Sequence, residues 1–248
     1  FAALLLALCA SQPACAGRKD LEPAPAWQTR QGRDQVRLEL AESLLEAGAT
    51  PQALQLLRDL RAEGRKEPVL DYLQGRALYE TGLFDEARAL LESATKRMHG
   101  DPRPWRTLGL LEADLQRLDE AIVALRRAAD LEANHAPTWN NLGYLLLSAR
   151  RHEEALDALQ RAVSLDASNA RYRNNLGFAQ AALGRDAEPL RTFRSAGPEP
   201  DAQANFALAK ELAGDPEAAR RHYDQALQLN PSHPHAPAGL QRLTFATQ

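Results

Sequence analysis

Small and large apolar residues alternate along this chain with a period of 34 residues. From Asp34, new units begin at Pro68, Pro102, Ala136 and Ala170, and after one shortened unit a last one begins at Pro200. Within each unit the apolar positions lie three or four residues apart, which is the spacing of helices. The pattern predicts two helices per unit, because a unit of this length forms one helix hairpin that stacks on its copies.

Small residues mark the places where the two helices of a unit should cross. The eighth residues of the six units are Ala41, Gly75, Gly109, Gly143, Gly177 and Ala207. The twenty-fourth residues are large: Leu57, Leu91, Leu125, Leu159, Phe193 and Tyr223. Only a small side chain lets two helices approach closely, so the alternation predicts an antiparallel pair packed small against large.

The turn inside each unit also has a recurring residue. Glycine occupies it in four units, at Gly48, Gly82, Gly184 and Gly214. A helix often ends in the left-handed conformation, which glycine adopts without steric cost. Gln116 and Arg150 take this place in the two middle units, so we expect left-handed residues there, each strained by about 1 kcal/mol.

Two stretches carry a recognisable signature. Trp105, Leu108-Gly109, Ala121, Leu125 and Ala128 recur one unit later as Trp139, Leu142-Gly143, Ala155, Leu159 and Ala162. With these residues the chain resembles the tetratricopeptide repeat (TPR) family over residues 34–233. The resemblance implies an all-α, right-handed solenoid of six helix-turn-helix units, at 34–67, 68–101, 102–135, 136–169, 170–199 and 200–233. Residues 234–248 are expected to form a capping helix that covers the last unit.

The N-terminal segment differs from the repeats. Residues 1–16 begin with an apolar run too short to cross a bilayer, and they look like an export signal whose start is missing. Cys9 and Cys15 are alternative lipidation sites in imperfect lipoprotein-like contexts, and cleavage before Gly17 is the secretory alternative. The third alternative is that residues 1–16 form an ordinary buried apolar helix. Residues 17–33, rich in Pro and Ala, are expected to be a flexible tether. The protein would then be exported, as a periplasmic protein or an outer-membrane lipoprotein.

Composition and the absence of known motifs limit the classes of function that we expect for this chain. The formal net charge is -3 with 25% charged residues, so no basic excess favours nucleic acid as a partner. The sequence has no phosphate loop, nucleophile elbow or zinc motif. His233 and His235, with His222 nearby, are not accompanied by Cys or clustered carboxylates, which favours a solvated turn over a metal site. We therefore expect no enzyme activity, no cofactor and no metal, and membrane contact only through a lipid anchor; the oligomeric state is left open.

The resemblance implies a concave groove lined by the first helix of each unit. The sixth residues of the last three units are Asn141, Asn175 and Asn205. A carboxamide can donate to and accept from the same peptide backbone, so this ladder predicts binding of an extended protein or peptide ligand. The alternative is that these amides bond locally to the neighbouring helix.

Aromatic and arginine side chains are expected beside this ladder. Tyr72, Tyr79, Tyr144 and Phe178 should project from first helices into the groove, with Arg76 and Arg106 near its N-terminal half. Such side chains are common anchors of protein interfaces. We expect a partly apolar peptide whose acidic portion lies near the two arginines, and partial burial between units is the alternative.

Together these features predict a non-enzymatic protein-interaction scaffold of the bacterial cell envelope. Gly32-Arg33-Asp34 is similar to TPR lipoproteins that help type IV pilus secretins assemble, and Asn174-Asn175-Leu176-Gly177 is similar to those of Tad pilus systems. An assembly factor for a pilus or secretion system is thus one expectation. The alternatives are a recruiting subunit for a separate cell-wall enzyme and a self-associating structural piece.

Overall fold

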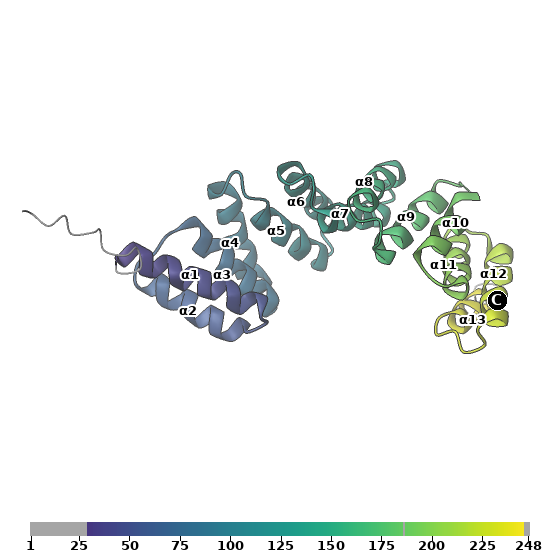
Figure 1. Ribbon diagram of the computed structural model, residues 1–248, viewed down its shortest axis with the longest axis horizontal. Coiled ribbons are helices and arrows are strands. Elements are labelled where there is room, and N and C mark those ends of the chain that lie inside the picture. Colours follow the sequence, from purple (N-terminus) through teal and green to yellow (C-terminus); the bar gives the residue numbers. More distant parts are fainter. Residues whose placement is uncertain (1–28, 186, 246–248) are drawn as a thin grey trace, which may run out of the picture.

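The computed structural model describes residues 29–185 and 187–245, which form thirteen α-helices and no strand. In chain order these are α1 (Arg30–Glu46), α2 (Thr50–Ala62), α3 (Pro68–Glu80), α4 (Phe84–Arg97), α5 (Pro102–Asp114), α6 (Leu118–Leu131), α7 (Ala136–Ser148), α8 (His152–Leu165), α9 (Ala170–Ala182), α10 (Ala187–Ala196), α11 (Glu199–Leu212), α12 (Pro216–Leu229) and α13 (Ala236–Phe245). They form an elongated array with α1 and α13 at opposite ends (Figure 1). The predicted all-α repeat fold is confirmed, while Cys9 and Cys15 lie outside the described residues.

Each unit is a hairpin whose helices meet at the predicted small residue. A Cβ atom on Gly143 of α7 would lie 2.5 Å from Cγ of Leu159 in α8. A Cβ atom on Gly177 of α9 would likewise lie 2.6 Å from the ring of Phe193 in α10. Since carbon atoms in contact normally stay 3.5–4.0 Å apart, these glycines are required for the approach of the helices.

The turns between paired helices have the predicted conformation. Gln116 and Arg150 have φ angles of 60° and 58°, in the left-handed region. The amide of Arg151 donates to the carbonyl of Leu146 at 2.9 Å, which closes the end of α7. The expectation of two left-handed residues that are not glycine is therefore confirmed.

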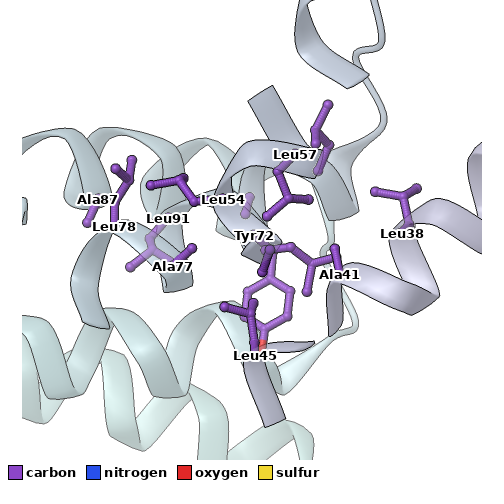
Figure 2. Close-up of a cluster of buried hydrophobic side chains, with 14 of the residues drawn as sticks. Leu38, Ala41, Leu45, Leu54, Leu57, Tyr72, Ala77, Leu78, Ala87 and Leu91 are labelled. Atoms are coloured by element: carbon purple, nitrogen blue, oxygen red, sulfur yellow. The ribbon is translucent and has the colours of Figure 1, made fainter. Parts of the chain in front are cut away.

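The core forms as a series of clusters along the array. The first cluster fills the space between α1 and α5, where the ring of Tyr72 lies beside Leu45 of α1 (Figure 2). The next cluster joins α6 to α9 around Leu142 and Leu159. Helix α6 joins the two clusters, because Ala124 belongs to the first and Ile122 to the second.

A buried carboxylate joins three helices in the first cluster. Asp71 of α3 is 3% exposed, and its Oδ1 accepts a hydrogen bond from Nη2 of Arg61 in α2 at 2.8 Å. Its Oδ2 accepts from Oγ of Ser93 at 2.8 Å and from Nη1 of Arg97 at 2.5 Å, both in α4. Burial alone would raise the pKa of Asp71, but the hydrogen bonds from Arg61, Ser93 and Arg97 outweigh it, so the pKa lies below its ordinary value.

The helix approach yields a first prediction. Gly143→Ala should lower the free energy of unfolding by about 1–3 kcal/mol, because the added methyl group overlaps Leu159 and forces the helices apart. Urea denaturation followed by circular dichroism measures the change. In the background of Leu159→Ala, which removes the atoms in the way, Gly143→Ala should cost much less. Equal losses in both backgrounds would contradict the steric explanation.

The Asp71 network yields a second prediction. Because the folded-state pKa of Asp71 is lowered, its contribution to stability is present above the unfolded-state pKa of about 3.9 and is lost as the pH falls through the folded-state pKa. Asp71→Asn should lower the free energy of unfolding at pH 7 by about 1–3 kcal/mol and flatten its loss between about pH 5 and pH 2. Denaturation at a series of pH values tests this. Parallel pH curves for both proteins would contradict it.

Candidate functional site

The predicted asparagines lie on three successive first helices and are joined to their neighbours. Nδ2 of Asn175 in α9 donates to Oδ1 of Asn140 in α7 at 2.8 Å. Nδ2 of Asn140 in turn donates to Oδ1 of Asn141 at 3.3 Å. The local bonding that the sequence left as an alternative is thus present between α7 and α9.

The same arrangement continues one helix further. Nδ2 of Asn205 in α11 donates to Oδ1 of Asn174 in α9 at 3.2 Å. These bonds use only part of each amide: Oδ1 of Asn175 and Asn205 and Nδ2 of Asn141 have no hydrogen-bond partner in the described part of the chain. The helix-to-helix bonds fix the orientation of the amides, so that an acceptor or donor on each remains available to a ligand.

A pocket of about 740 Å³ lies beside Asn175, between α7, α9 and α11. Its apolar lining includes Tyr144, Phe178 and Leu212. Phe178 is fixed by an edge-on contact with the ring of Phe193, at 5.1 Å between centroids. Tyr144 and Leu212 are 57% and 74% exposed, so the pocket combines a rigid wall with an uncovered apolar rim.

Arg150 is the charged side chain among the described residues that line this pocket. The described residues of the lining also include His152, and none of them is Asp or Glu. Arg150 makes no ion pair with any described residue, and Nδ1 of His152 is buried without a hydrogen-bond partner there. The pocket therefore suits an apolar group that carries a negative charge or a hydrogen-bond donor next to it.

The predicted aromatic residues of the N-terminal half are engaged within the protein. Tyr72 is only 4% exposed, and the guanidinium of Arg103 lies 5.2 Å from its ring centroid. Tyr79 is half-buried, and its hydroxyl donates to Oδ2 of Asp114 at 2.6 Å. Burial and this hydrogen bond raise the pKa of Tyr79 well above its ordinary range. Both rings serve packing between units in this structure.

The two predicted arginines are also paired. Nε of Arg76 donates to Oε1 of Glu80 at 3.0 Å, and Arg106 forms an ion pair with Glu132. Arg150, which the sequence reasoning did not place in the groove, is the cation next to the pocket. The sequence feature that distinguishes Arg150 is its position in the turn, where four other units have glycine.

The histidines near the C-terminus have a structural role. Nδ1 of His233 accepts from the amides of His235 and Ala236 at 3.2 and 3.1 Å, at the start of α13. Its Nε2 lies 3.0 Å from Oδ1 of Asp201, so one ring joins α13 to α11. Across the described ranges, no group of three or more His, Cys, Asp or Glu is placed to hold a metal ion. None of the helices described here is both long and apolar enough to cross a membrane.

Comparisons with known proteins identify the repeat. A family model described as TPR repeat matches residues 151–184, and models described as tetratricopeptide repeat match residues 35–59, 72–136 and 200–233. The chain therefore contains tetratricopeptide repeats in its N-terminal, central and C-terminal parts. No curated protein matches the chain.

Solved structures share the architecture. YrrB, described as a TPR protein with an unusual peptide-binding site, is 20% identical with a TM-score of 0.62, over 75% of this chain and 97% of its own. Two structures of MamA are 24% and 20% identical, with TM-scores of 0.59 and 0.57. They cover 66% and 65% of this chain and 90% and 88% of their own. At these identities the likeness establishes the fold alone.

Proposed function

Because the chain is built of tetratricopeptide repeats, we propose that it is a protein-interaction scaffold that binds an extended segment of a partner over α7, α9 and α11. The observation that carries this proposal is the 740 Å³ pocket beside Asn175, with its exposed apolar rim. The description of YrrB as a peptide-binding TPR protein supports this use of the fold. In this role the chain acts by holding its partner, with no reaction of its own and no cofactor.

The chemistry of the groove describes the bound segment. An apolar side chain would enter between Tyr144 and Leu212, which are exposed in the free protein. Oδ1 of Asn175 would accept from a backbone N–H of the ligand, and Nδ2 of Asn141 would donate to a carbonyl. A carboxylate next to the apolar side chain would lie near Arg150. This moves the acidic portion of the ligand away from Arg76 and Arg106, whose charges are already paired.

The backbone of Arg150 supports its proposed role. A residue with a side chain is strained by about 1 kcal/mol in the left-handed region, and glycine would relieve that strain. Strained residues that persist tend to lie at functional sites. Arg150 lines the pocket, whereas Gln116, the other strained residue, is not among the residues that line it. The two therefore form a matched pair for experiment.

We further propose that the protein works in the bacterial envelope, as an assembly factor for a pilus or secretion system. The support is the export-like sequence of residues 1–16 and the similarity of short motifs to pilus-associated TPR lipoproteins. The Pro/Ala-rich segment that follows would let a folded scaffold extend from a membrane anchor.

In-cell photo-crosslinking tests the groove. A photoreactive residue in place of Tyr144 should capture one discrete partner in cells that naturally make the protein. Arg150→Gly should reduce this adduct several-fold while raising the unfolding free energy by about 0.5–1 kcal/mol, since it removes both the charge and the strain. Asn175→Ala should also reduce the adduct, because a hydrogen bond to the ligand is lost. Adduct yield is measured on immunoblots, and the partner is identified by mass spectrometry.

The matched control is Gln116→Gly, which relieves the same backbone strain away from the pocket. It should raise stability by a similar amount and leave the adduct unchanged. If Arg150→Gly and Gln116→Gly give the same adduct as the unmodified chain, the ligand does not use the charge of Arg150. If no adduct forms from position 144, the groove is not the binding surface.

Export has its own test. Residues 1–33, preceded by Met and two Lys, should make fused alkaline phosphatase active, because this reporter needs disulfides that form outside the cytoplasm. Labelled palmitate should enter the fusion, and either Cys9→Ser or Cys15→Ser should remove the label. An active but unlabelled fusion would indicate a freely periplasmic protein, and an inactive one would contradict export.

A further inference from the structure

A second recess lies between the helices of the middle units, away from Asn175 and its pocket. It has a volume of about 340 Å³ and is lined by residues of α4, α5 and α6; we call it the α4–α6 slot. Trp105 and Leu108 of α5 and Val123 of α6 provide apolar lining. Val123 is 66% exposed, so apolar surface is left uncovered at this junction. The volume is at the low end of ligand pockets and suits one or two side chains.

The polar lining of the slot is acidic. It includes Glu92 of α4 and Asp119 and Glu120 of α6, and none of these three forms an ion pair with another described residue. A fourth carboxylate, Glu112, is buried and is already bound, because Oε1 accepts from Nε of Arg88 at 2.7 Å. Asp119 also interacts electrostatically with Arg151, whose main partner is Glu154, so the negative charge that no cation of the described chain pairs with is that of Glu92 and Glu120.

The next junction along the array, between α6 and α8, offers a comparison. Thirty-four residues after Glu92 and Glu120 stand Arg126 and Glu154, which form an ion pair at 2.7 Å between α6 and α8. At the α4–α6 junction the same two positions hold glutamates, which repel each other and cannot form a bridge. In the register of Val123 the next unit has Asp157. The α4–α6 junction thus lacks the bridge and exposes an apolar side chain where its neighbour has a charged one.

The side chains beneath the α4–α6 slot also differ from those of the next junction. Arg88 and Glu112 occupy the register of Ile122 and Leu146, which are both 1% exposed. A buried ion pair in place of two packed aliphatic side chains does not usually increase stability, because both charges lose their hydration. Four positions of this junction therefore differ together from those of the junction that follows it.

We propose that the α4–α6 slot is a second docking surface, which takes a basic segment of a partner protein. An arginine or lysine of that segment lays its aliphatic stem on Val123 and Trp105 and places its cation between Glu92 and Glu120. Arginine fits best, because its planar guanidinium stacks on an aromatic ring while it donates to carboxylates. The occupant of the slot is thus basic, whereas the ligand of the groove beside Arg150 is acidic, and the two surfaces can be occupied at once.

The test uses a substitution that copies the neighbouring junction. Glu92→Arg should form the missing bridge to Glu120, as Arg126 does to Glu154, and so fill the slot without harming the fold. The probe is a fluorescein-labelled dodecapeptide of alternating Leu and Arg, titrated with the full chain at about 0.15 M salt and followed by anisotropy. We expect binding to the unmodified chain and at least tenfold weaker binding to Glu92→Arg, whose melting temperature should be equal or higher.

The control for net charge is Asp224→Arg, at the same register position in α12, where Asp224 is exposed. It should change binding by less than about twofold, since a specific contact outweighs screened long-range attraction. Equal losses in the two variants, no loss in Glu92→Arg, or equal binding of a Leu–Glu peptide would each overturn the proposal. A concentration-dependent dimer that Glu92→Arg dissociates would also overturn it, because the slot would then hold a second copy of the chain. The crosslink from position 144 should be unaffected by Glu92→Arg, so the two surfaces are tested separately.

Discussion

The close approach of two helices within each unit is the constraint on which the rest of the structure depends. A side chain at Gly143 or Gly177 would overlap the large residue sixteen positions later. Once that approach is fixed, each pair of helices can stack on the next, and the first helices α7, α9 and α11 come into contact. Asn175 bonds to Asn140, and Asn205 to Asn174, because this stacking brings the sixth residue of one unit next to the fifth residue of the unit before it.

At the surfaces of the stacked helices, packing places fewer constraints on which residue occupies a position. The backbone at the end of α7 must be left-handed to close the turn, but nothing in the packing requires an arginine there, and glycine would be less strained. Packing does not require two glutamates at positions 92 and 120 either. In the neighbouring junction an arginine stands in the register of Glu92 and forms an ion pair with the counterpart of Glu120. Arg150 strains the turn that it occupies, and Glu92 and Glu120 lack an ion pair that the helix spacing allows. In both places the residues present give less local stability than the fold could have. Such departures are expected where a protein binds something.

The sequence was sufficient for the fold and only partly sufficient for the site. The helices, their pairing and the left-handed turns at Gln116 and Arg150 follow from a period and from residue size, which are local properties. Whether a charge is free depends on contacts between separate helices. Arg106 meets Glu132, and Tyr79 meets Asp114, across 26 and 35 residues of sequence. The register could place these side chains near the groove, but it could not show that other residues already bind them.

The comparison of one junction with the next adds information that a single unit cannot provide. When six units share a backbone, each residue has counterparts in the same surroundings, and the counterpart shows what packing alone accepts at that place. Arg126–Glu154 shows that a bridge between second helices is geometrically available. Its absence at Glu92 and Glu120 is therefore a property of those two side chains and not of the helix spacing. By the same reasoning, the four glycines equivalent to Arg150 show that its side chain is dispensable for the turn. In a repeat protein the positions that break the repeat are for this reason the first place to look for binding.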